Sequence, residues 1–237
     1  GDLIGASTFE SFVANDKPTI DALNEAGLDV SAVGNHEFDQ GYDDLVNRVI
    51  AEYDEDTNPD GGAEWKYLGA NVKFKASGDP ALDGTWIKDQ GGVQVGYVGA
   101  VTEHLPELVS PDGIAEIEVT DIVEATNAAA DDLVDEGADI VVLLVHEGAP
   151  TTSCADIAAL GAGTDFGSIV QGVNDNVDAI VSGHTHLAYD CSFPVDGWSD
   201  RAVTERPVVS AGQYGTNLNQ LVFTVDPATG DVQAKTQ

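Results

Sequence analysis

Short runs of apolar, mostly β-branched residues alternate along this sequence with segments of helical periodicity, and this alternation restricts the fold more than any other feature. It is typical of a layered α/β domain, in which helices cover the faces of β-sheets. The expected strands are residues 30–33, 67–71, 93–101, 140–145, 179–182, 207–211, 221–225 and 232–234. The expected helices are residues 18–26, 42–53, 121–136 and 165–173, the third of them capped by Thr120.

The segments between these elements are interpreted as turns and loops of one domain. With 237 residues the chain is long enough for one sizeable core and too short for two full domains. Residues 226–230 predict a turn that joins the last two strands into an antiparallel hairpin at the edge of the sheet. Residues 54–64 and 151–164 are expected to be loops, because they are rich in turn-forming or small residues.

The chain has a large excess of acidic residues. It carries 9 Lys and Arg against 42 Asp and Glu, which gives a formal net charge of −33 at pH 7. Phosphate-backbone binding needs clustered Lys and Arg, so this charge argues against a nucleic-acid polymer as partner and against electrostatic attachment to an anionic membrane. It is interpreted as the solvated surface of a salt-adapted or secreted protein, with the binding of many cations as the alternative.

Other features bear on where the protein works. No run of about 18 apolar residues occurs, so no membrane-spanning segment is expected. The sequence contains no Met, which predicts that residue 1 lies inside a longer gene product, after processing or by truncation. The lack of a long apolar run also predicts that any signal peptide has been removed. Cys154 and Cys191 are the only two cysteines. Outside the cytoplasm they predict a disulfide bond, and two unrelated buried thiols are the alternative.

Histidines follow three of the expected strands at the point where each strand ends. The first strand leads into Asn35 and His36, the fourth into His146, and the fifth into His184 and His186. Ligands of open α/β sheets lie beyond the carboxyl ends of the strands, so these side chains are expected to meet at one rim of the sheet. Such a convergence indicates a functional site.

The residue types at this rim suit a metal site. Asp2 looks like part of a loop beyond another strand and would reach the same rim. Carboxylate, amide and imidazole groups together favour Zn, Mn, Fe or Co over Ca or Mg. Each residue alone is explained as well by an ordinary turn or core position, but their joint arrival at one rim favours metal binding. His104 lacks this support and is assigned no role.

Five sequence motifs carry a resemblance to a known family. They are GDLIGAS at 1–7, GNHEFD at 34–39, VHEG at 145–148, GHTH at 183–186 and AGQYGTNL at 211–218. In this order and spacing the chain resembles the calcineurin-like metallophosphoesterases, and within them the secreted 5'-nucleotidase and 2',3'-cyclic-nucleotide phosphodiesterase family. The resemblance implies a layered α/β/β/α sandwich of mixed β-sheets flanked by helices, with its N-terminal strand missing, in a secreted, periplasmic or cell-surface protein.

The resemblance also implies roles for individual residues. The implied metal ligands are Asp2 as a bridge between two ions, Asn35, His146 and His184 on one ion, and His186 on the other. The implied catalytic residues are His36, which protonates the leaving oxygen or stabilises the phosphorane-like charge, and Asp39, which orients His36. The chemistry agrees with this, because an imidazole with a pKa of about 6.5 is an effective general acid.

The activity implied is metal-dependent phosphoester hydrolysis, in the first place that of a 5'-nucleotidase, by attack of a hydroxide that bridges two divalent ions about 3.5–4 Å apart. The alternatives are a 2',3'-cyclic-nucleotide phosphodiesterase or other phosphoesterase, and a non-catalytic fragment that keeps only the fold. The family's first Asp-x-His motif and its C-terminal substrate domain are absent from residues 1–237. We therefore expect a metal-binding domain truncated at its N-terminus, holding one ion or none by itself, with a small nucleotide or phosphoester as substrate and the substrate domain of the same parent chain as partner.

Overall fold

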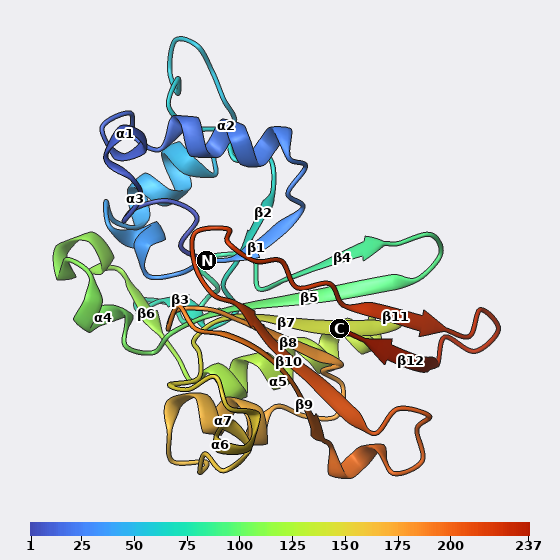
Figure 1. The fold of residues 1–237 in the computed structure, drawn as a ribbon. Coiled ribbons are helices and arrows are strands. Elements are labelled where there is room, and N and C mark those ends of the chain that lie inside the picture. Colours follow the sequence, from blue (N-terminus) through green and yellow to red (C-terminus); the bar gives the residue numbers. More distant parts are fainter.

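A six-stranded mixed β-sheet forms the centre of the computed structural model, which describes residues 1–237 (Figure 1). The strands lie in the order β4 (Thr85–Asp89), β5 (Gln94–Val101), β7 (Ile140–His146), β8 (Ala179–Ser182), β10 (Glu205–Ala211) and β9 (Ala188–Pro194). The four inner strands run parallel, and the two edge strands are antiparallel to their neighbours. The carboxyl ends of the inner strands therefore meet at one rim, as the sequence predicts.

Three helices cover one face of this sheet. They are α5 (Ile122–Asp135), α6 (Cys154–Ala158) and α7 (Asp165–Gly172). Alternate residues of the strands point toward them, so Val141, Leu143 and Val145 of β7 join a core cluster of 18 buried residues. The helix α5 begins one residue later than predicted. Its N-cap is Asp121 rather than Thr120, because the Asp121 carboxylate accepts a hydrogen bond from the Glu124 amide at 2.7 Å.

The last two strands pack on the opposite face of the sheet. The antiparallel pair β11 (Val222–Val225) and β12 (Val232–Thr236) confirms the predicted hairpin, but it is a separate two-stranded sheet rather than the edge of the main one. Its apolar residues contact the other set of alternate residues, among them Ile140 and Val142 of β7. This packing removes the apolar side chains of the second face of the sheet from water, which favours the observed position.

The N-terminal part has its own core beside the main sheet. Its strands are β1 (Val30–Ala32) and β2 (Lys66–Leu68), which pair in parallel, and β3 (Val72–Phe74) and β6 (Ile117–Val119), which pair antiparallel. Its helices are α1 (Phe9–Phe12), α2 (Lys17–Glu25), α3 (Tyr42–Asp44), a π-helical turn (Leu45–Val49) and α4 (Leu105–Leu108), with 3₁₀ turns at His36–Phe38 and Pro111–Ile114. A further 3₁₀ turn (Asp196–Trp198) follows β9. The N-terminal core contains 15 buried residues.

The predicted α/β fold class is confirmed, since mixed sheets and helices alternate in layers. Two local predictions are wrong. The helix expected at 42–53 ends at Val49, because the Asn58 side chain and the Ala63 amide take carbonyls that a longer helix would have used. The loop expected at 151–164 contains α6, which Ser153 caps by accepting from the Asp156 amide at 3.3 Å.

A disulfide bond joins Cys154 at the start of α6 to Cys191 in the edge strand β9. Cys191 is 2% exposed and belongs to the main core. The bond therefore ties the helical layer to the edge of the sheet.

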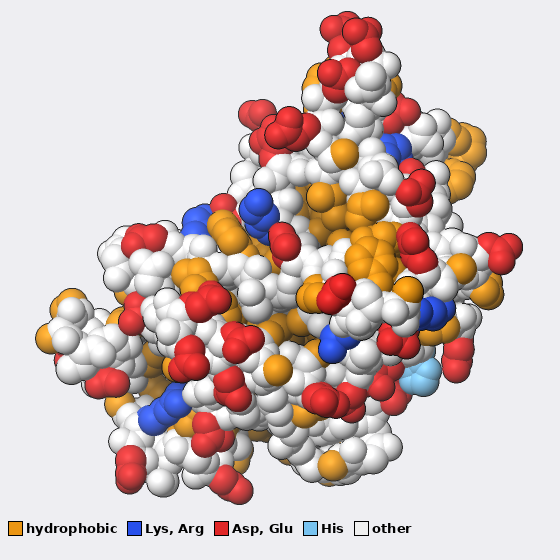
Figure 2. All heavy atoms as spheres, turned by 180° about the vertical axis from the view of Figure 1, so that it is seen from behind, with side chains coloured by type: hydrophobic (Ala, Val, Ile, Leu, Met, Phe, Trp, Pro, Cys, Tyr) orange, Lys and Arg blue, Asp and Glu red, His pale blue; other side chains and the backbone are white.

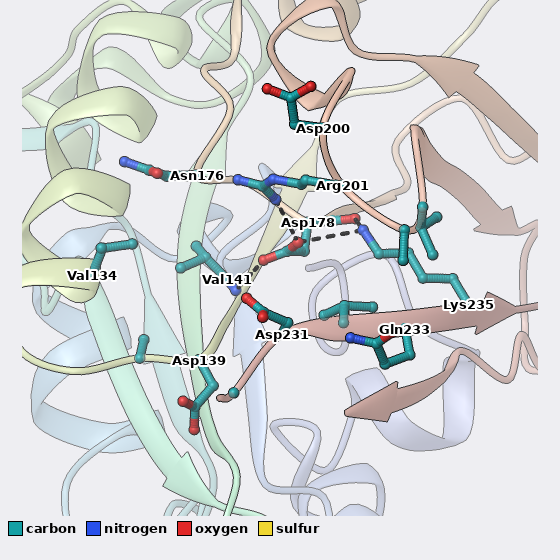
Figure 3. Close-up of a pocket in the computed structure, with 15 residues that line it drawn as sticks. Val134, Asp139, Val141, Asn176, Asp178, Asp200, Arg201, Asp231, Gln233 and Lys235 are labelled. Carbon is teal, nitrogen blue, oxygen red and sulfur yellow. Dashed lines mark hydrogen bonds and ion pairs between the residues drawn. The ribbon is translucent and has the colours of Figure 1, made fainter. Parts of the chain in front are cut away.

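A partly buried polar cluster contacts the C-terminal strand (Figure 3). Lys235 of β12 donates to the carboxylate of Asp178 at 3.3 Å, and Arg201 reaches the same oxygen at 3.4 Å. The Lys235 ammonium also lies 4.1 Å from the centre of the Trp198 ring. Asp178, Arg201 and Lys235 line a cavity of about 510 Å³ at the amino ends of β7 and β8, away from the rim that carries the histidines.

Lys235 predicts a pH dependence of stability. Burial lowers its pKa from 10.5 to about 8, although Asp178 opposes the shift. Between these values the unfolded chain holds a proton that the folded chain has lost, so the free energy of unfolding should rise with pH by up to about 1.4 kcal/mol per pH unit. Urea unfolding between pH 8 and 10 should show this rise in the wild type and in the exposed-site control Lys66→Met. It should be absent in Lys235→Met, and parallel profiles for all three proteins would contradict the prediction.

Acidic side chains are spread over the face seen in Figure 2, with few Lys or Arg between them. None of the helices has both the length and the apolar character needed to cross a lipid bilayer.

Candidate active site

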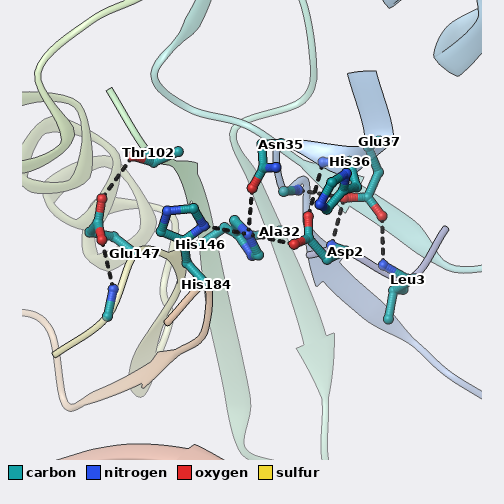
Figure 4. A network of polar contacts seen from close by, with 12 residues as sticks. Asp2, Leu3, Ala32, Asn35, His36, Glu37, Thr102, His146, Glu147 and His184 are labelled. Atoms are coloured by element: carbon teal, nitrogen blue, oxygen red, sulfur yellow. Dashed lines mark hydrogen bonds and ion pairs between the residues drawn. The ribbon is translucent and has the colours of Figure 1, made fainter. Parts of the chain in front are cut away.

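Three strand ends bring the predicted site residues together (Figure 4). His146 is the last residue of β7, and His184 follows β8 after one glycine. Asn35 follows β1 and begins the 3₁₀ turn that carries His36. The loop of Asp2 lies beside this turn, because the His36 amide donates to Asp2 Oδ1 at 3.0 Å.

Four of the predicted ligands form one group. His146 Nε2 lies 3.0 Å from Asp2 Oδ2, 3.1 Å from Asn35 Oδ1 and 3.3 Å from His184 Nδ1. Ligand atoms of Asp2, His146 and His184 all lie within 4.8 Å of one another. A carboxylate, two imidazoles and an amide oxygen around one point are a donor set that suits a divalent transition metal.

The protonation of this group also suits metal binding. Burial raises the pKa of Asp2, but the hydrogen bond and charge of His146 outweigh it, so the pKa falls to about 2. Burial lowers the pKa of His146. At neutral pH the carboxylate is therefore ionised and the imidazole neutral, which are the forms that bind metals.

Close backbone packing fixes the distance between the loops of the site. A Cβ atom on Gly34 would lie 2.2 Å from Asp2 Oδ1 and 2.9 Å from His146 Cε1. Any other residue would push the carboxylate and the imidazole apart. The glycine of the GNHEFD motif is thus required by the approach of Asp2 to His146.

The predicted catalytic pair lies next to this group. His36 Nδ1 is 2.8 Å from Asp39 Oδ2, and about one third of each side chain is exposed to solvent (33% and 32%). Because Asp39 engages Nδ1, the Nε2 atom of His36 is the one available to a substrate.

The other two histidines stand apart. His186 is exposed, has a φ of 62° and packs its ring against Tyr214, with 6.3 Å between ring centres. It does not belong to the Asp2 group. His104 lies 3.3 Å from Asp165 and 3.6 Å from Glu107, and these carboxylates raise its pKa.

Two buried glutamates were assigned no role from the sequence. Glu37 is 1% exposed, and its carboxylate accepts from the amides of Asp2, Leu3 and Gly34 at 2.7, 2.8 and 2.6 Å. Glu147 is 6% exposed and accepts from the Thr102 hydroxyl at 2.7 Å. Each directly follows a predicted site histidine, which is the one signal in the sequence that could have found them.

Comparison with protein-family models gives one match. The model described as calcineurin-like phosphoesterase matches residues 1–188. This range contains Asp2, Asn35, His146, His184 and His186.

Several curated proteins are similar in sequence, among them an endonuclease and two nucleotidases. Endonuclease YhcR of Bacillus subtilis is 31% identical over 237 residues, which cover 99% of this chain and 18% of that protein. The 2',3'-cyclic-nucleotide 2'-phosphodiesterase/3'-nucleotidase of Salmonella typhimurium is 26% identical over 260 residues, covering 98% of this chain and 36% of that protein. The 5'-nucleotidase of Diplobatis ommata is 27% identical over 219 residues, covering 86% and 33%. The chain thus spans between 18% and 36% of the length of these relatives.

A solved structure has the same fold. The crystal structure of a 5'-nucleotidase precursor from Thermus thermophilus superposes with a TM-score of 0.67 at 20% sequence identity, over 97% of this chain and 41% of that chain.

Proposed function

Because this chain belongs to the calcineurin-like phosphoesterase family, we propose that it hydrolyses phosphoesters of nucleotides with divalent metal ions, in the first place as a 5'-nucleotidase. The observation that carries the proposal is the position of the His36–Asp39 pair beside the metal-ligand group of Asp2, His146 and His184. A domain that only bound a metal would not need a paired imidazole next to it.

Members of the family use divalent metals, and the donor set of this site fits one. Asp2, Asn35, His146 and His184 would hold one ion. We propose His186 as a ligand of a second ion that shares Asp2, with Zn, Mn, Fe or Co as the metal. Bound ions supply Lewis-acid activation of the phosphoester and of the attacking water at neutral pH.

His36 and Asp39 are responsible for proton transfer to the departing oxygen. In hydrolysis a water oxygen forms a bond to phosphorus while the bond from phosphorus to the ester oxygen breaks. His36 Nε2 gives its proton to the departing oxygen and regains one from solvent, to which its side chain is open. Asp39 accepts the Nδ1 hydrogen bond, which fixes the tautomer and orientation of the ring.

A phosphodiester is the second candidate substrate. The names of two relatives support this candidate. The relative with 31% identity is named an endonuclease, and another relative is named a cyclic-nucleotide phosphodiesterase. The net charge of −33 favours a small substrate over a nucleic-acid polymer. We propose that another domain of the same parent chain recognises the nucleoside.

A location outside the cytoplasm belongs to the same proposal. The bond between Cys154 and Cys191 supports it, because structural disulfides persist in oxidising compartments. Secreted, periplasmic and cell-surface proteins all meet this condition.

The test is metal-dependent turnover of the 237-residue chain. Protein stripped with a chelator would be reloaded with Mn²⁺, Zn²⁺ or Co²⁺, analysed for bound metal, and assayed with AMP and with bis-p-nitrophenyl phosphate. Hydrolysis of AMP that returns with metal supports the 5'-nucleotidase, and hydrolysis of the diester alone supports the second candidate. Because nucleoside recognition is assigned to another domain of the parent chain, the same assay is repeated on the parent protein. Absence of bound metal and of hydrolysis in both proteins would overturn the proposal.

A further inference from the structure

Asp16 is a buried carboxylate that the proposed reaction does not use. It is 1% exposed and accepts hydrogen bonds from the Gly5 amide at 2.9 Å, the Ser7 hydroxyl at 2.5 Å and the Ser11 hydroxyl at 2.7 Å. No ion pair of the structure includes Asp16, so its hydrogen-bond donors are all neutral groups. Such burial is costly. A carboxylate, however, accepts from three donors at once without donating, which few side chains do.

The backbone at Asp16 is adapted to this arrangement. Its φ is 60°, a left-handed conformation that is uncommon outside glycine. Its carbonyl accepts from the amides of Thr19 and Ile20 at 3.0 and 2.9 Å, which anchors the residue to the first turn of α2. The backbone of Asp16 is therefore fixed by α2, and its carboxylate binds the segment of residues 5–11, which runs into α1.

The end of this loop touches the His36–Asp39 pair. Gly5 has a φ of 91°, and a Cβ atom there would lie 2.4 Å from the His36 carbonyl oxygen, 2.7 Å from His36 Cβ and 2.8 Å from Asp39 Oδ2. The Cα atom of Gly5, which carries no side chain, therefore packs directly against His36 and Asp39. Both side chains are otherwise partly exposed to solvent, so the contact with Gly5 limits their movement.

We infer that Asp16 and Gly5 are positioning residues for the proton donor: the Asp16 carboxylate holds Gly5 against His36 and Asp39 and so keeps the imidazole aimed at the departing oxygen. The inference rests on the proposed function, since it assigns these residues to the same proton transfer. Neither residue touches the substrate. Their effect should appear only where the leaving group needs a proton.

Leaving-group dependence separates this role from a general structural one. The 5'-oxygen of AMP needs a proton to depart, whereas the phenolate of 2,4-dinitrophenyl phosphate departs without one. Gly5→Ala should lower kcat for AMP by about 10²-fold, the lower end of the range for general acid catalysis, and kcat for the dinitrophenyl ester by less than about threefold. Metal content should not change.

The matched control is Gly92→Ala. Gly92 has a φ of 96°, close to that of Gly5, but a Cβ atom there would meet nothing within 4 Å. The control carries the same backbone strain without the contact, so both kcat values should stay at the wild-type level.

Asp16 is tested with two variants. Asp16→Ala removes all three hydrogen bonds and should lower the AMP to dinitrophenyl ester ratio as Gly5→Ala does. Asp16→Asn keeps one carbonyl acceptor for the Gly5 amide, while the Ser7 and Ser11 hydroxyls can turn to accept from its amide. It should restore most of the ratio.

The outcomes are distinguishable. A fall in the ratio for Gly5→Ala and Asp16→Ala, with recovery in Asp16→Asn, supports the inference. An equal loss for both esters, or no loss, in folded and metal-loaded Gly5→Ala overturns it. If the wild type hydrolyses neither ester, the proposed function itself fails.

Discussion

Replacing His36 by alanine is expected to slow hydrolysis of AMP by about 10²–10⁴-fold, the range that a positioned general acid contributes. The variant loses the imidazole that is paired with Asp39 beside the Asp2 group. Metal content should stay at the wild-type level, because His36 lies outside the set of donor atoms. Steady-state kinetics and metal analysis on the same preparation check both statements.

His104→Ala is the matched control. His104 is also paired with carboxylates, those of Asp165 and Glu107, but it lies outside the site. Its removal should leave kcat within about twofold of the wild type, as expected for an exposed residue away from the chemistry. Equal rates for His36→Ala and the wild type would refute the assignment of the proton donor.

Replacing Asp2 by alanine is expected to weaken metal binding by more than about 100-fold, since loss of a partner outside the coordination shell already costs 10–100-fold. Asp2 is the only carboxylate in the group, and without it two imidazoles and an amide oxygen would have to hold the ion with no anionic ligand. Isothermal titration with Mn²⁺ or Zn²⁺ measures the loss. Hydrolysis should fall with it.

The control for this variant is Asp29→Ala. Asp29 pairs with Lys88 at the surface, so its removal changes the net charge by the same amount without touching the site. Any general effect of charge on cation binding should appear equally in both variants. Unchanged metal affinity in Asp2→Ala would show that Asp2 is not a ligand.

The sequence predicts the main sheet well, because its inner strands are buried on both faces. The run at 140–145 is apolar throughout and becomes β7 almost unchanged, and 179–182 becomes β8. Edge and short strands are less visible. The strand β9 alternates buried Tyr189 and Cys191 with exposed neighbours, yet its Asp and Ser residues hide this pattern among loop residues. The strand β4 and the three-residue β3 and β6 were also missed, because tertiary contacts rather than local preference form them.

The candidate site could be predicted as a set of residues but not as a geometry. Histidines at strand ends locate the rim, and the structure groups Asp2, Asn35, His146 and His184 there. The hydrogen bonds that hold the loops of the site together cannot be recognised from the sequence. Three of the four partners of Glu37 are backbone amides, two of them 34 and 35 residues away, and a backbone amide has the same chemistry at every position.

The pairing of Cys154 with Cys191 is a similar case. They are 37 residues apart, and this spacing alone does not distinguish a bond from two separate thiols. The structure answers the question by bringing α6 against β9.

The two hydrophobic cores have a thermodynamic consequence for the site. Val145, next to His146, belongs to the core under the main sheet, whereas Val33 and Ile4, near Asn35 and Asp2, belong to the N-terminal core. An ion held by Asp2 and His146 together would be a cross-link between two units that could otherwise open separately. Binding of the ion would therefore increase the cooperativity of unfolding, so that at saturating metal the two cores should unfold in one transition. The bound ion would also raise the free energy of unfolding of the whole chain by mass action.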